Sequence, residues 1–264
     1  MFESLAQIGK AGTLFLSHLG SISRLSFQTL YWTFIAPCHR KAYNYSEVAF
    51  QMNRVGVKSF GIVSLITFLI GVILCLQSAY VAEPFGQLEA VPGAVGVSLV
   101  REIAPLMVSI VITGRVGAAY AAELGAQKVA DEITALECMA INPIGFLIAP
   151  RFLAVMVMLP VLTIYGNLMG ILGGYIIGVY QYGISPNVYI ENTWNFIQMK
   201  DITSGMLKSI VFAFTICMVG CYKGFTVTGG STGVGRATME AVVLSLVLII
   251  ASDAVFTALS IRYW

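Results

Sequence analysis

Two adjacent charged residues, Arg101 and Glu102, stand within an apolar stretch that covers about residues 95–122. Ionised side chains at membrane depth are costly, so they usually face the interior of a helix bundle or a water-filled cavity. One interpretation is a polar lip on a substrate cavity that opens to the outer side of a membrane, with Gln77 lining the same cavity. The alternative is an ion pair with another helix or with lipid headgroups. For Asp253, in the last apolar stretch, the alternative is a buried hydrogen bond between packed helices.

The segment at residues 121–143 predicts a short amphipathic helix between two apolar stretches, ended by an Asn-Pro pair. Its polar positions carry mainly acidic residues. Anionic inner-leaflet lipid would prefer Lys and Arg, so the acidic face favours a docking helix for a cytoplasmic partner over a helix that rests on lipid. The apolar positions are Val129, Ile133, Leu136 and Ala140, and the polar neighbours are Lys128, Asp131, Glu132 and Glu137.

Motifs for catalysis and for nucleotide binding are absent from the sequence. The Gly- and Thr-rich stretch at residues 222–238 has no Lys after its glycines, and no GxxxxGK[ST] motif occurs anywhere in the chain. HExxH, GxSxG and acidic metal clusters are also missing. The five cysteines form no CxxC pair, which argues against a metal or redox site. We therefore expect no catalytic residue, no metal and no cofactor in this chain.

Four glycines follow one another at a period of four residues within the apolar stretch at about 148–180. Small residues at that spacing lie along one face of a helix and let another backbone approach closely. The alternative is that glycine is simply common in membrane helices. The residues are Gly166, Gly170, Gly174 and Gly178.

The composition fits a membrane protein. Charged residues make up 11% of the 264 residues and hydrophobic residues 58%, whereas an ordinary soluble domain has about 25% charged residues. A disordered chain would be more polar, and a net charge of +2 without a basic block gives no sign of nucleic-acid binding. We expect an all-α integral membrane protein with about five transmembrane helices. The predicted spans are about 59–82, 95–122, 148–180, 205–224 and 238–260.

Lys and Arg are concentrated before the first predicted span and are absent from the loop that follows it. This bias places the N-terminus in the cytoplasm and the C-terminus outside, as five spans require. Residues 1–54 have an amphipathic pattern that is too polar to cross a membrane, which predicts helices lying in the membrane interface. The alternative is a soluble cap on a partner protein. The transmembrane domain is predicted to cover residues 55–264.

Several long runs together resemble the MlaE/YrbE-type permease family over about residues 55–260. They are VREIAPLMVSIVITGRVGAAYAAELGAQKVADEITALECMAINP, PRFLAVMVMLPVL, KSIVFAFTICMVGCYKG and GGSTGVGRATMEAVV. The resemblance implies a phospholipid permease of an ABC transporter in a bacterial inner membrane, where it helps maintain outer-membrane lipid asymmetry, or in a plastid inner envelope. It also implies a homodimer with two cytoplasmic ATPase subunits, which bind the ATP and Mg, and a periplasmic oligomer of MCE-domain proteins.

The resemblance further implies roles for individual residues. A coupling helix at about 123–140 would meet the ATPase, with Glu123 and Lys128 in the same segment. In the family, the lipid cavity lies between the first spans of two protomers, and an Arg at its mouth could bind a phosphate through two directed hydrogen bonds. Positions that match the core motif of the coupling helix are Asp131, Glu132, Ile133, Ala135 and Leu136. Positions that match the cavity or its mouth are Leu74, Phe85, Arg101 and Glu102.

Two other classes of function stay open as alternatives. A secondary transporter or channel, driven by an ion gradient and carrying an apolar solute, would need ionisable residues on several spans and often internal repeats. Only Arg101, Glu102 and Asp253 qualify, and the sequence shows no repeat. A membrane enzyme acting on lipids would need a catalytic constellation, which the sequence does not contain.

Overall fold

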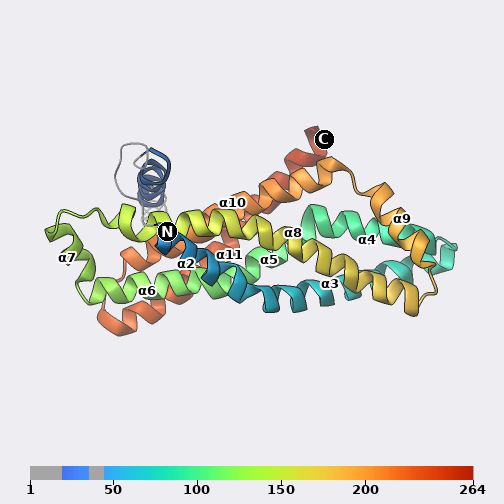
Figure 1. Ribbon diagram of the computed structural model, residues 1–264, viewed down its shortest axis with the longest axis horizontal. Coiled ribbons are helices and arrows are strands. Elements are labelled where there is room, and N and C mark those ends of the chain that lie inside the picture. Colours follow the sequence, from blue (N-terminus) through green and yellow to red (C-terminus); the bar gives the residue numbers. More distant parts are fainter. Residues whose placement is uncertain (1–19, 36–44, 264) are drawn as a thin grey trace, which may run out of the picture.

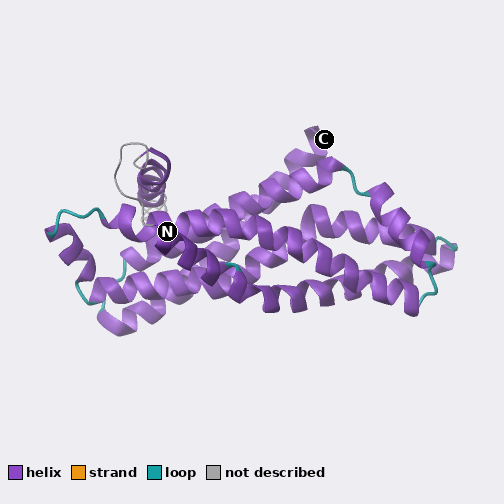
Figure 2. Ribbon diagram, in the orientation of Figure 1, coloured by secondary structure: helices purple, strands orange, loops and turns teal. Residues whose placement is uncertain are grey.

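Long apolar runs become long helices in the computed structural model, which describes residues 20–35 and 45–263. Every regular element in those two ranges is helical (Figure 2). Five of the described helical stretches are long and apolar enough to cross a membrane, which confirms the predicted fold class. They run over Tyr45–Phe85, Leu88–Val129, Ile144–Tyr180, Met199–Phe225 and Gly230–Ser260.

The first two spans are built from several shorter elements, and the later ones from longer helices. The first span joins α2 (Tyr45–Val55), η3 (Val57–Ser59), α3 (Phe60–Ala82) and η4 (Glu83–Phe85). The second joins η5 (Leu88–Ala90), α4 (Val91–Ser98), η6 (Leu99–Ile103), α5 (Ala104–Ile112), η7 (Thr113–Gly117) and α6 (Ala118–Val129). After α7 (Glu132–Cys138) come η8 (Ile144–Ile148), α8 (Ala149–Tyr180), α9 (Pro186–Phe196), α10 (Met199–Phe225) and α11 (Gly230–Tyr263).

The second span contains a π-helical turn, η6, where a proline prevents regular α-helical bonding. Pro105 has no N–H, so it cannot donate to the carbonyl of Arg101 four residues earlier. The N–H of Ala104 donates instead to the carbonyl of Leu99, five residues back. Arg101 and Glu102 therefore lie in a wide turn rather than in a regular α-helix, a feature that is frequent at functional sites.

Glycines let α3 and α8 approach each other until their backbones touch. A Cβ atom added at Gly71 would lie 1.8 Å from the carbonyl oxygen of Gly170, and one added at Gly173 would lie 2.2 Å from the carbonyl oxygen of Phe68. The four glycines of the predicted stripe all lie at contacts with neighbouring elements. Gly166 faces Thr67 and Val108, and Gly170 faces Leu99. Gly174 faces the hydroxyl of Tyr189 and Gly178 faces its ring.

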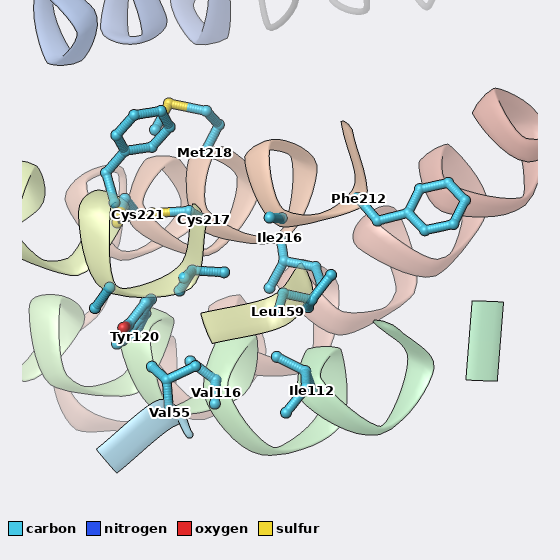
Figure 3. Close-up of a cluster of buried hydrophobic side chains, with 14 of the residues drawn as sticks. Val55, Ile112, Val116, Tyr120, Leu159, Phe212, Ile216, Cys217, Met218 and Cys221 are labelled. Atoms are coloured by element: carbon cyan, nitrogen blue, oxygen red, sulfur yellow. Dashed lines mark hydrogen bonds between the residues drawn. The ribbon is translucent and has the colours of Figure 1, made fainter. Parts of the chain in front are cut away.

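Two apolar clusters form the interior of the bundle. The larger one joins α2, α5, α6, α8 and α10, and Figure 3 shows how its side chains point toward one another. The smaller one joins α3 to α4 and η6 around Cys75 and Val95. Labelled members of the larger cluster are Val55, Ile112, Val116, Tyr120, Leu159, Phe212, Ile216, Cys217, Met218 and Cys221.

The helices α7 and α9 occupy opposite ends of an elongated bundle (Figure 1). The helix at residues 20–35 lies near the end that carries α7, with Trp32 against Gly145 and the aromatic side chains of Phe27, Tyr31 and Phe34 exposed. The rest of the predicted interfacial region before α2, at residues 1–19 and 36–44, lies outside the described residues.

The α3–α8 contact predicts different effects for two glycines of the same helix. Gly71→Ala would place a methyl group against the backbone of Gly170 and is expected to destabilise the fold by about 1–3 kcal/mol, the usual range for overpacking. Gly61→Ala is the matched control, because a Cβ atom there meets nothing within 4 Å. Thermal unfolding in detergent measures both, and equal midpoints for the two variants would contradict the close contact.

Candidate functional site

A cluster of paired charges lies inside the bundle where three spans meet. Lys208 of α10 is only 1% exposed, and its ammonium nitrogen lies 2.5 Å from Glu102 Oε2 and 2.8 Å from Asp253 Oδ1. The same nitrogen donates to the hydroxyl of Thr257 at 2.8 Å, and that hydroxyl donates to Glu102 Oε1 at 3.0 Å. One ammonium group thus holds together the second, fourth and fifth spans.

Arg101 extends this cluster toward the start of α10. Its guanidinium lies 3.6 Å from Asp201 Oδ1 and donates to the hydroxyl of Ser260 at 3.0 Å. The other oxygen of Asp201 accepts the backbone N–H of Gln198 at 3.0 Å, as one half of a capping box. Asp201 therefore fixes the first turn of α10 and the position of Arg101 at the same time.

This geometry bears on both interpretations of Arg101 and Glu102, the ion pair with another helix and the polar lip of a cavity. Each side chain makes an ion pair with another helix, and each is also about one third exposed, at 31% and 33%. The ion pairs offset the free-energy cost of removing each charge from water. The exposed edges leave polar atoms accessible to a ligand or to a second protein chain. Asp253 pairs with an ammonium group rather than only with a neutral hydrogen-bond donor.

Sequence reasoning missed Lys208, Thr257, Asp201 and Ser260. A lone Lys inside the apolar run of the fourth span was the available signal, because such a charge needs a carboxylate on another span. The hydroxyls of Thr257 and Ser260 gave no signal, since Thr and Ser are common in membrane helices and bond equally well to their own backbone. Asp201 lies in a polar segment where an acidic residue needs no explanation.

The remaining predicted cavity residues lie on the first span. Leu74 is half-buried in α3, Gln77 of α3 is exposed, and Phe85 of η4 is exposed. A separate cavity of about 480 Å³ lies between α8 and α9, and none of these three residues lines it. Its walls are mostly apolar, with Tyr175, Tyr189 and Trp194 among them.

Tyr189 fixes α9 against α8. Its ring stands edge-on to that of Tyr175, with the centroids 5.3 Å apart, and it fills the space beside Gly174 and Gly178. Burial raises the pKa of the Tyr189 phenol above its ordinary value, with a smaller contribution from the nearby Cys75. The phenol is therefore uncharged, as an apolar setting requires.

The segment predicted as one helix over 123–140 is two helices. α6 ends at Val129, Asp131 takes a left-handed conformation with φ of 57°, and α7 starts at Glu132. The apolar period runs through this break, so periodicity does not detect it. On α7 and the turn before it, Ile133 is buried and Leu136 is half-buried, whereas Asp131, Glu132 and Ala135 are exposed.

Glu123 and Lys128, predicted as part of the same segment, lie on α6 and contact other helices. Glu123 pairs with Arg54 of α2 and with Arg151 of α8. Lys128 donates to the carbonyl of Phe225 at the end of α10. The structure thus separates an exposed acidic end on α7 from a set of internal contacts on α6.

Comparison with known proteins gives a consistent result. The family model described as "Permease MlaE" matches residues 48–259. A probable ABC transporter permease protein of Rickettsia felis is 33% identical over 96% of this chain and 95% of its own length. The intermembrane phospholipid transport system permease protein MlaE of Haemophilus influenzae is 32% identical, over 79% of this chain and 80% of its own. The chloroplastic protein TRIGALACTOSYLDIACYLGLYCEROL 1 of Arabidopsis thaliana is 35% identical, over 79% and 59%.

The ion cluster predicts that Lys208 contributes much of the stability of the half of the bundle in which it lies. Lys208→Met leaves Glu102 and Asp253 without their cation and is expected to cost about 3–5 kcal/mol, the range for breaking a buried pair. Lys223→Met, which breaks a pair with the exposed Glu240, is expected to cost at most about 1 kcal/mol. Thermal unfolding of the two variants in detergent is the measurement, and similar losses of stability would contradict the assignment.

Proposed function

The chain belongs to the MlaE permease family, and from that premise we propose that it is the membrane subunit of an ABC transporter that moves phospholipids. Its relatives are named as permease proteins, and five of the described helical stretches could span a membrane, as such a subunit requires. The observation that carries the proposal is the family match over residues 48–259, which covers three of the five spans completely and the other two except for a few terminal residues. The phospholipid cargo is inferred from the name of the Haemophilus relative.

We propose that energy comes from a separate ATPase that contacts α7. The sequence contains no phosphate-binding loop, so ATP and its Mg would be bound by that partner. α7 lies at one extremity of the bundle (Figure 1), and Asp131 and Glu132 are exposed there. An exposed acidic helix end fits a partner with a basic docking surface.

We propose that the lipid is held between two copies of this chain. Gln77 and the free edges of Arg101 and Glu102 are polar surfaces on membrane spans, and a second copy would cover them from the hydrocarbon. Leu74 would contact acyl chains, Phe85 would lie near the mouth, and Arg101 offers a guanidinium for the phosphate. The supporting observation is that these polar groups are partly exposed in the single chain.

The distribution of Lys and Arg supports an orientation with α7 in the cytoplasm and α9 on the outer side. We propose an inner membrane as the location if the source is a bacterium, and a plastid inner envelope if it is a plant or alga. The end that carries α9 and η4 would then face a periplasmic oligomer of MCE-domain proteins. This partner is an inference from family membership.

Charge reversal on α7 tests the ATPase contact. The double variant Asp131→Lys/Glu132→Lys would place two cations against a basic surface, and recovery of the ATPase subunit with the tagged permease is expected to fall about tenfold or more. Quantitative mass spectrometry of the purified complex is the measurement. Glu191→Lys, an exposed site on α9 at the opposite end, is the control and should leave recovery unchanged. Full recovery of the ATPase with the double variant would remove α7 as the contact.

Lipid movement by the complex tests the function itself. The complex, purified from its native membrane and reconstituted in vesicles that contain a fluorescent phosphatidylethanolamine, is expected to move the probe only when ATP and Mg are supplied. Movement driven by an ion gradient without ATP would instead support a secondary transporter. A complex that hydrolyses ATP but moves neither this probe nor a fluorescent phosphatidylglycerol would contradict the phospholipid cargo.

A further inference from the structure

Glu123 connects α6 to two other helices near the end of the bundle that carries α7. α6 packs against α10 and α11, whereas α2 packs against α8, which also packs against α10. The carboxylate of Glu123, on α6, forms ion pairs with both α2 and α8. One oxygen pairs with the guanidinium of Arg54 on α2, and the other lies 3.3 Å from Nη2 of Arg151 on α8. A single side chain thus ties α6 to the first and third spans.

The two arginines have different surroundings, and Glu123 forms an ion pair with each of them. The Arg151 side chain is 8% exposed, donates to the carbonyl of Leu147 at 3.2 Å, and lies with its guanidinium carbon 5.6 Å from the centre of the Tyr120 ring. Arg54 and Glu123 are each about one third exposed. Without Glu123, the buried guanidinium of Arg151 would lose its carboxylate, which is costly in a setting of low polarity.

Glu123, Arg54 and Arg151 form a triad of charges, and Glu123 lies close along the chain to α7. α6 continues into α7 through a turn of only two residues, Ala130 and Asp131. A displacement of α7 has only this short turn to cross before it reaches α6. Apolar side chains at a helix contact can slide past one another, but a carboxylate held by two guanidinium groups keeps a defined geometry.

Several polar atoms around the triad have no hydrogen-bond partner within the described residues. They include Nε of Arg151 and the hydroxyl of Tyr120, which Figure 3 shows within the core. Gln127 lies one turn after Glu123 on α6, and Gln51 lies one turn before Arg54 on α2; the side-chain oxygen of each is also unpartnered. Because these atoms add no hydrogen bonds among the described residues, the polar contacts that hold α6 to α2 and α8 here are the two ion pairs of Glu123.

We propose that Glu123 is the positioning residue that transmits the displacement of α7 to the first and third spans, through Arg54 and Arg151. This transmission role rests on the proposed function, because the displacement would come from the ATPase bound at α7. Glu123 is accordingly not a contact for the ATPase. It determines how much of the motion at α7 reaches the spans.

The test compares lipid movement with ATP hydrolysis in the same reconstituted complex. Glu123→Gln keeps the shape of the side chain and removes its charge. We expect the variant permease to bind the ATPase and to support ATP hydrolysis, while the amount of fluorescent phosphatidylethanolamine moved per ATP falls about fivefold or more. Glu240→Gln is the matched control, since Glu240 also bridges two cations, Lys223 and Arg236, on the exposed side of α10 and α11. The amount of lipid that this control moves per ATP hydrolysed should equal that of the wild type.

A second variant keeps the test decisive if Glu123→Gln assembles poorly. Arg54→Gln leaves the pair between Glu123 and Arg151 in place and is expected to lower the same ratio by a smaller factor. In the double variant, the two effects should not multiply, because both changes break one network.

The outcomes separate the possible explanations. A Glu123→Gln complex that unfolds at a lower temperature but moves as much lipid per ATP as the wild type would show that the triad only stabilises the fold, and would overturn the proposal. Effects of Arg54→Gln and Glu123→Gln that multiply would overturn it as well. A wild-type complex that moves no lipid with ATP would instead refute the proposed function, and the transmission role with it.

Discussion

The ammonium group of Lys208 is buried between the carboxylates of Glu102 and Asp253, and the arrangement of the spans depends on this contact. A bilayer offers no water to an unpaired charge, so the second, fourth and fifth spans must meet where their ionised groups can neutralise one another. Arg101 and Asp201 extend the same rule to the start of α10, where a single carboxylate both caps a helix and receives a guanidinium. Helix positions in this half of the bundle follow from charge pairing as much as from apolar packing.

Close packing at glycines holds the third span against the first. Glycines on both α3 and α8 remove the side chains that would keep the helices apart, so that backbone atoms come into contact. In lipid, helices gain little by hiding apolar surface from one another, and close packing supplies the attraction. Tyr189 uses the same glycine stripe on α8 and thereby fixes α9 at one end of the bundle. Charge pairs and glycine contacts together determine one arrangement of the spans.

The charges at the end that carries α7 are organised differently from those around Lys208. There Glu123 and Arg54 are each about one third exposed and Arg151 is buried, whereas the cation of the other cluster, Lys208, is only 1% exposed. Each network contains a buried polar atom without a hydrogen-bond partner among the described residues: Nε of Arg151 in one, and in the other Oδ1 of Asp253, which is ion-paired with Lys208. The bundle therefore combines a charge cluster around a buried ammonium group with a partly exposed triad near α7.

Much of the fold followed from the sequence alone. The five spans could be recognised because long apolar runs have few other stable structures in a chain with so little charge. Family membership followed from long runs of specific sequence, which the family match over residues 48–259 confirmed. Periodicity also indicated an amphipathic segment near residue 130, but it could not show the break at Asp131, because the apolar period continues across that residue.

Only the tertiary structure decided which charges meet. The sequence marked Arg101, Glu102 and Asp253 as unusual. For Arg101 and Glu102 it left both an ion pair and a ligand-binding role open, because partners on different spans leave no local pattern. The position of Lys208 between two carboxylates depends on how three spans pack, and so does the capture of Glu123 by arginines from two other helices. Sequence identifies the groups that need a partner in a membrane, and packing determines which partner each one receives.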